Sequence, residues 1–166
     1  AAFGLRHRVT SIKHALVIMG LSEVRRWIAV LTVTGLSGEK PRVLAEAAIV
    51  RARMAELLAT PAGLAHRASE LFLTGLLSLM DALLDRPMSE VVDLLPLTDN
   101  TRTALLGEVG PFLPVLQLVT AYESAQWEQV EALAPALGIH QAFLPEAYAD
   151  SLAWADELGR LEKSRA

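Results

Sequence analysis

The spacing of hydrophobic positions along the chain predicts helices almost throughout. Apolar residues recur every three or four positions, and no stretch alternates apolar and polar residues over the length of a strand. Prolines, glycines and N-capping residues divide this pattern into segments. We therefore predict an all-α fold, with helices over residues 11–20, 22–35, 41–59, 64–84, 90–95, 98–106, 114–122, 123–137 and 141–159.

One of these predicted helices differs from the rest in its polar positions. The helix over residues 64–84 is apolar nearly all round after Glu70, which is typical of a helix buried on several sides. The break at Thr60-Pro-Ala-Gly63 separates it from the helix over residues 41–59. We expect residues 1–110 to form the main helical domain, and residues 111–166 to form a C-terminal helical extension packed on it.

Composition narrows the class of protein. Hydrophobic residues make up 52% of the chain and aromatic residues only 5%, a balance typical of packed helices. The net charge of -4 offers no basic patch for nucleic acid or an anionic membrane. The longest charge-free runs, residues 27–38 and 109–122, are shorter than the roughly 18–20 apolar residues that span a bilayer. The absence of Cys excludes disulfides and agrees with a cytoplasmic location. We expect neither a nucleic-acid partner nor a membrane span.

Residue types that can bind metals are present, but their spacing does not form a metal site. His7, His14, His66 and His140 never form the Glu-x-x-His or His-x-x-x-His spacing that brings ligands to one helix face. Asp81 and Asp85 are four residues apart, a spacing that fits the solvated end of a helix better than a metal site. The chain also has no Gly-x-Ser-x-Gly motif and no glycine-rich phosphate loop. The sequence therefore predicts no catalytic residues, no metal and no cofactor.

The most unusual polar group is Arg51-x-Arg53-x-x-Glu56, on an otherwise apolar helix. Arg53 and Glu56 have the i,i+3 spacing of an ion pair. A surface pair of little energetic weight is the favoured interpretation. The alternatives are a partly buried polar latch and an interaction patch for an acidic partner.

Several segments resemble HDOD domains, the HD-related output domains of bacterial signalling proteins. Ser11-Ile-Lys-His-Ala-Leu-Val-Ile-Met-Gly20 is similar to the family's "SI-x-x-A-(I/L)-x-x-LG" segment. Ile49-Val-Arg-Ala-Arg-Met-Ala-Glu-Leu-Leu58 and Phe72-Leu-Thr-Gly-Leu-Leu-Ser-Leu-Met-Asp81 resemble helices of a subgroup, the EAL-HDOD or modified HD-GYP proteins. In that subgroup the domain follows an EAL domain, the cyclic di-GMP phosphodiesterase fold. Residues 1–4, 21–27 and 93–97, together with Trp127, fit the same pattern, so the resemblance covers most of the chain.

The resemblance implies an HD-like helical bundle that serves as a regulatory or output module through protein–protein contacts. It implies that the first helices of the domain lie upstream of Ala1, and apolar surface left by them would favour a homodimer. A working HD domain follows Gly-Leu-Leu with adjacent His and Asp ligands, whereas this chain has Ser78-Leu79. These residues cannot replace an imidazole and a carboxylate at a divalent metal, so we expect no enzyme activity.

Two other functions remain open. One is a divergent phosphohydrolase that uses Asp81, Asp85 and either His66 or His14. The other is a ligand sensor that binds a nucleotide or an acidic metabolite near Arg51 and Arg53.

Overall fold

The computed structural model describes residues 42–163, which contain eight α-helices, one short 3-10 helix and no strand. The prediction of an all-α fold is confirmed. The helices predicted over residues 11–20 and 22–35 lie outside the described residues, as do His7, His14 and Trp27. The elements are α2 (Arg42–Ala59), η1 (Ala65–Arg67), α3 (Ala68–Leu77), α4 (Met80–Leu84), α5 (Met88–Asp93), α6 (Asp99–Leu105), α7 (Leu113–Glu123), α8 (Trp127–Ala136) and α9 (Phe143–Lys163).

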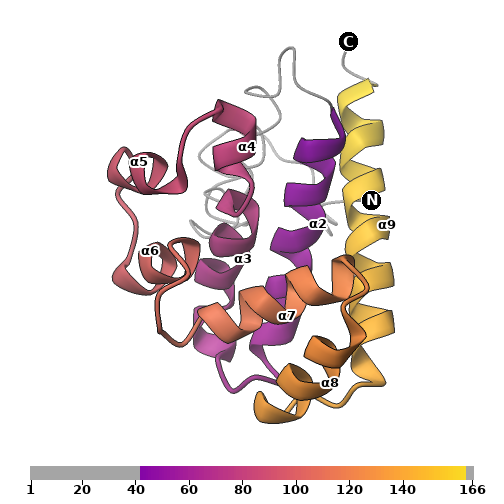
Figure 1. Cartoon of the computed structure of the whole chain (residues 1–166). Helices are drawn as coiled ribbons and strands as arrows, with labels where there is room; N and C mark the ends of the chain where they lie inside the picture. Colours follow the sequence, from indigo (N-terminus) through magenta and orange to yellow (C-terminus); the bar gives the residue numbers. More distant parts are fainter. Residues whose placement is uncertain (1–41, 164–166) are drawn as a thin grey trace.

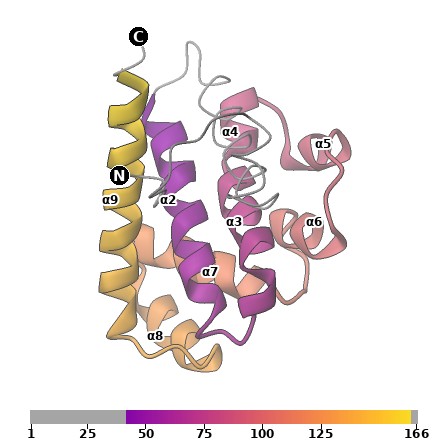
Figure 2. The same ribbon diagram turned by 180° about the vertical axis from the view of Figure 1, so that it is seen from behind.

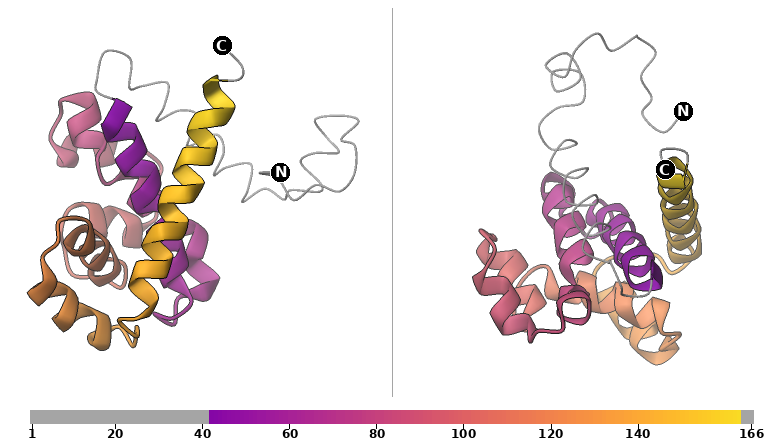
Figure 3. Two further views of the ribbon diagram at one scale, coloured as in Figure 1. Left: turned by 90° about the vertical axis from the view of Figure 1, so that its right-hand side faces the viewer. Right: turned by 90° about the horizontal axis from the view of Figure 1, so that it is seen from above.

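Helix α2 is the centre of the described bundle. It lies between α3 and α9, which run alongside it, and α7 crosses it (Figure 1; Figure 2). Figure 3 shows the same order from above, with α5 and α6 on the far side of α3 from α2. No helix in residues 42–163 is long and apolar enough to cross a membrane. Because α2 has neighbours on several sides, Arg51 and Arg53 contact different helices.

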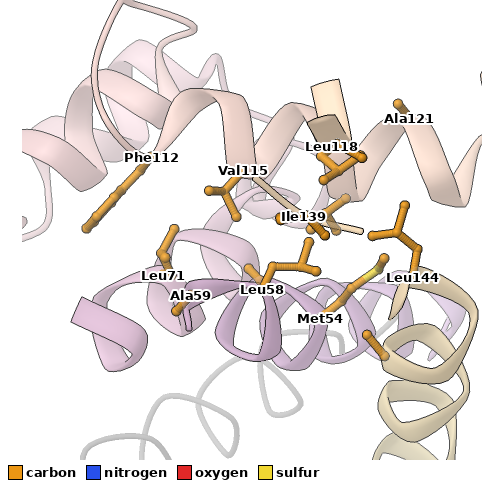
Figure 4. Packing of buried hydrophobic residues seen from close by; sticks show 14 of the residues in the cluster. Met54, Leu58, Ala59, Leu71, Phe112, Val115, Leu118, Ala121, Ile139 and Leu144 are labelled. Atoms are coloured by element: carbon orange, nitrogen blue, oxygen red, sulfur yellow. The ribbon is translucent and has the colours of Figure 1, made fainter. Parts of the chain in front are cut away.

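Two clusters of buried side chains form the apolar core, and α2 contributes to both. Figure 4 shows the first cluster, which joins the C-terminal half of α2 to α7 and the start of α9. Its members are Met54, Ala55, Leu58, Ala59, Leu71, Ala104, Phe112, Val115, Leu118, Val119, Ala121, Val130, Ala134, Ile139, Leu144 and Ala147. The second cluster joins the N-terminal half of α2 to α3, α4 and α5. Its members are Ala45, Ala48, Ile49, Val50, Ala52, Phe72, Leu76, Met80, Leu83, Val91, Ala155 and Leu158.

The first cluster draws residues from both sides of position 110. Side chains from α2 and α3 pack there with side chains from α7, α8 and α9. The division into a domain over residues 1–110 and an extension over residues 111–166 stays a prediction.

The prediction of one continuous helix over residues 64–84 is wrong. The segment forms η1, α3 and α4, with a joint at Ser78 and Leu79. Leu79 has φ -118° and ψ 13°, outside the helical range. Asp85 then ends α4 in the left-handed conformation, with φ 53°. Neither Ser78 nor Leu79 breaks a helix strongly by itself, and Ser78 receives a hydrogen bond from Arg51 of α2.

Several other helix boundaries also differ from the prediction. Helix α8 begins at Trp127 rather than at Glu123, because Ala125 adopts φ 54° and the Gln126 N–H donates to the Ala121 carbonyl, which closes α7. Helix α9 continues to Lys163, past the predicted end at residue 159. Ser89 lies inside α5 rather than capping it, since the residue before the helix is Pro87.

Candidate functional site

Arg51 joins three elements at the middle of the bundle. Its Nε donates to Glu123 Oε2 over 2.5 Å, which links α2 to the last residue of α7. Its Nη1 donates to Ser78 Oγ over 3.3 Å, which links α2 to the joint after α3. The side chains of Arg51 and Glu123 are only 17% and 23% exposed. An ion pair that is mostly buried is less screened by solvent than an exposed pair and interacts more strongly.

Ser78 is the residue that the resemblance to HD domains compares with one of their metal ligands. Its hydroxyl donates to the Gly75 carbonyl over 2.7 Å and accepts from Arg51. The Ser78 N–H also points to the Gly75 carbonyl, at 3.3 Å. The serine proton is therefore directed at a backbone acceptor. This is the geometry of a helix end and not that of an activated nucleophile, which needs a base at this position.

Arg53 bonds on the opposite side of α2. Its Nη2 and Nε donate to Asp150 Oδ2 of α9 over 2.9 and 3.2 Å. Its Nη1 donates to Glu56 Oε2 over 2.9 Å, so the ion pair predicted from the i,i+3 spacing is present. The guanidinium also lies over the Trp154 ring, 5.9 Å from its centroid.

The structure does not bring Arg51 and Arg53 together. Residues two apart on a helix point in nearly opposite directions. Arg51 accordingly contacts α7 and the α3–α4 joint, whereas Arg53 contacts α9. One ligand bound by both arginines does not fit this arrangement. The hypothesis of a ligand sensor at either arginine stays a prediction, and an anion there would have to compete with carboxylates of the chain itself.

The residues considered for a phosphohydrolase site are also separated. His66 lies in η1, before α3, while Asp81 lies beyond its end. A helix of ten residues is about 15 Å long, too far for His66 and Asp81 to bind one metal ion. Asp85 follows α4 in the left-handed conformation. Within residues 42–163, no group of three His, Cys, Asp or Glu side chains could hold a metal ion, and His14 lies outside the described residues.

A second polar network was not anticipated from the sequence. Arg67 donates from Nε and Nη2 to the two carboxylate oxygens of Glu70 over 2.9 and 2.8 Å. Thr98, at the start of α6, donates to Glu70 Oε2 over 2.9 Å, and its Oγ1 lies 3.2 Å from that of Thr101. Thr101 is buried and lies against the buried Thr74 of α3. The network thus attaches α6 to α3, and its only sequence signal was the i,i+3 spacing of Arg67 and Glu70.

The hydrogen bond from Arg67 is the largest influence on the Glu70 carboxyl. It lowers the pKa of Glu70 below its ordinary value; burial opposes this shift, and the hydrogen bond from Thr98 adds to it. The same hydrogen bond raises the pKa of Arg67. Both groups are therefore held in their charged forms.

Large apolar side chains are exposed at several places on the described surface. Trp127 is 55% exposed at the start of α8, with its ring edge-on to Tyr122 at 5.6 Å between centroids. Trp154 lies instead at the edge of the second cluster, edge-on to Phe72 at 5.8 Å. Leu94 after α5 is 63% exposed. Exposed aromatic side chains of this kind commonly anchor protein–protein contacts.

Comparison with known proteins places the chain in its family context. The HDOD domain family matches residues 1–85. The chain is 33% identical over 157 residues to the uncharacterized protein YuxH of Bacillus subtilis, covering 93% of this chain and 38% of that protein. It is 29% identical over 153 residues to the cyclic di-GMP phosphodiesterase CdgJ of Vibrio cholerae, covering 92% of this chain and 35% of that protein. The chain thus spans little more than a third of these relatives. No solved structure gives a significant match.

Proposed function

Because the chain belongs to the HDOD family, we propose that it is a non-catalytic regulatory or output module of a bacterial signalling protein. The observation that carries the proposal is the Ser78-Leu79 pair, which follows Gly75-Leu76-Leu77 where the resemblance to HD domains implies a His-Asp ligand pair. Ser78 bonds to an arginine and a backbone carbonyl. Neither residue offers an imidazole or a carboxylate to a metal.

A role in cyclic di-GMP signalling is the more specific part of the proposal. It is supported by the similarity to a protein named as a cyclic di-GMP phosphodiesterase, in which the matched segment is 35% of the length. We propose that this chain belongs to a longer cytoplasmic protein that also contains an EAL domain, as the resemblance to EAL-HDOD proteins implies. The module would then act on that domain or on another protein by contact. Exposed apolar side chains such as Trp127 and Leu94 are the kind of groups that make such contacts, including those of a homodimer.

The first experiment combines elemental analysis of the purified chain with a cyclic di-GMP hydrolysis assay on the same sample. We expect no stoichiometric metal and no turnover. Bound metal together with turnover that Asp81→Ala abolishes would show instead that the chain is a divergent phosphohydrolase. Asp99→Ala, an exposed acid on α6, is the matched control for a non-specific loss.

A second measurement tests the regulatory part. The cyclic di-GMP phosphodiesterase rate of the full-length protein is compared with that of the same protein lacking residues 1–166. A changed rate is expected if the module regulates the enzyme. An identical rate, together with an absence of binding between the separated parts, would contradict regulation through contact.

A further inference from the structure

The joint between α3 and α4 contradicts the helical preference of its own sequence. Residues 68–84 contain no proline, and their single glycine lies three residues before the joint. Leu, Met and Ala, which dominate this segment, are among the best helix formers. Even so, Leu79 leaves the helical conformation, with φ -118° and ψ 13°. Disagreements between local preference and structure are expected at functional or strained positions.

A local hydrogen bond and contacts with two other helices accompany the broken form. The Ser78 hydroxyl bonds to the Gly75 carbonyl and accepts from Arg51 Nη1, and Glu123 at the end of α7 holds Arg51 through Nε. The backbone of Gly75 is itself pressed against that of Arg51. Arg51 thus connects the break at Ser78, 27 residues away in the sequence, to Glu123, 72 residues away.

We propose that the joint at Ser78 and Leu79 is a two-state switch and that Arg51 is its latch. While Arg51 is bound to Glu123 and Ser78, the segment stays broken. When Arg51 is released, the segment adopts the continuous helix that its sequence favours, and α4 and α5 move relative to α7. The two states differ in one small set of polar contacts and one turn of helix. A small free-energy difference of this kind can be reversed by a ligand or partner that binds one state better than the other.

The position of the latch determines what moves. Helices α4 and α5 bury Met80, Leu83 and Val91 in the second cluster, whereas α7 packs in the first. The contact between Arg51 and Glu123 connects the α7 side of the bundle to the joint that leads into the second cluster. Releasing it would change the position of one cluster relative to the other. This switch would exist whether or not the chain regulates a phosphodiesterase.

The absence of native Cys makes the switch measurable by spin labelling. Labels on Glu90→Cys in α5 and Gln117→Cys in α7, both exposed positions, report the distance across the joint by electron–electron double resonance. The doubly labelled parent should give one distance population. Arg51→Gln and Glu123→Gln should each add a second population and raise the helix content measured by circular dichroism. Arg53→Gln, which removes an arginine from the same helix that pairs with α9 instead, should keep the parent distance.

A folded Arg51→Gln protein with only the parent distance would overturn the switch. If that variant does not fold, Glu123→Gln decides, because it keeps the side-chain volume and removes the charge. A single parent-like distance in Glu123→Gln overturns the proposal, and a second population supports it. A second population that appears equally in Arg53→Gln would also overturn it, since the effect would then not belong to Arg51.

Discussion

Gly75 of α3 lies so close to Ala52 of α2 that a Cβ atom at position 75 would stand 2.8 Å from the Cα atom of Ala52. The same atom would stand 2.6 Å from the Arg51 carbonyl oxygen. Backbone atoms on both sides leave no flexible side chain to give way. This close approach places Ser78, one turn further along, within reach of the Arg51 guanidinium.

Gly75→Ala is therefore expected to destabilise the protein. Alanine favours a helix over glycine by about 1 kcal/mol, but overpacking costs about 1–3 kcal/mol and backbone contacts put this position at the upper end. Urea denaturation followed by circular dichroism measures the free energy of unfolding. Ser69→Ala, on the exposed side of the same helix, is the control and should change stability by no more than about 0.5 kcal/mol. A Gly75→Ala protein as stable as the parent would show that α2 and α3 do not pack this closely.

Glu70→Gln should make the protein less stable at neutral pH by about 1 kcal/mol, because it weakens the charged contact with Arg67. The pKa of Glu70 is lower in the folded protein than its ordinary value of 4.5, so the stabilising contribution is fully present above pH 4.5. This contribution is lost as the pH falls through the lower pKa that Glu70 has in the folded protein. The difference between parent and variant should thus shrink at acid pH.

Unfolding free energies measured from pH 7 down to pH 3 check this dependence. Glu128→Gln, at an exposed position on α8, removes the same charge and should show no comparable effect. A difference between parent and Glu70→Gln that stays constant over the whole range would contradict a carboxylate contact.

Leu118→Ala and Leu152→Ala should differ widely in stability. Leu118 is fully buried in the first cluster, so truncation removes apolar burial and leaves a cavity, at a cost of about 2–5 kcal/mol. Leu152 is 46% exposed on α9, and the same truncation should cost less than about 1 kcal/mol. Thermal unfolding of the two variants side by side tests the packing of α7 onto α2. Equal losses would mean that α7 does not cover the core as described.

Signals from residues close together in the sequence were sufficient to predict several structural features. The end of α2 was predicted at residue 59 and is found at Ala59, because the Thr60-Pro61 break acts within a few residues of it. The pairing of Arg53 with Glu56 was also predictable, since i,i+3 residues on a helix are neighbours wherever the helix lies. The family was recognised from ordered segments, which sequence similarity preserves directly.

The sequence by itself determined the helical class and the approximate limits of most helices, and its resemblance to HD domains implied that Ser78 and Leu79 replace a ligand pair. Only the tertiary structure decided where the helix over residues 64–84 breaks and which acids hold the arginines of α2. Glu123 and Asp150 lie 72 and 97 residues from their arginines, and no local pattern links them. Such contacts depend on how α7 and α9 pack against α2, and that packing is a property of the whole buried core.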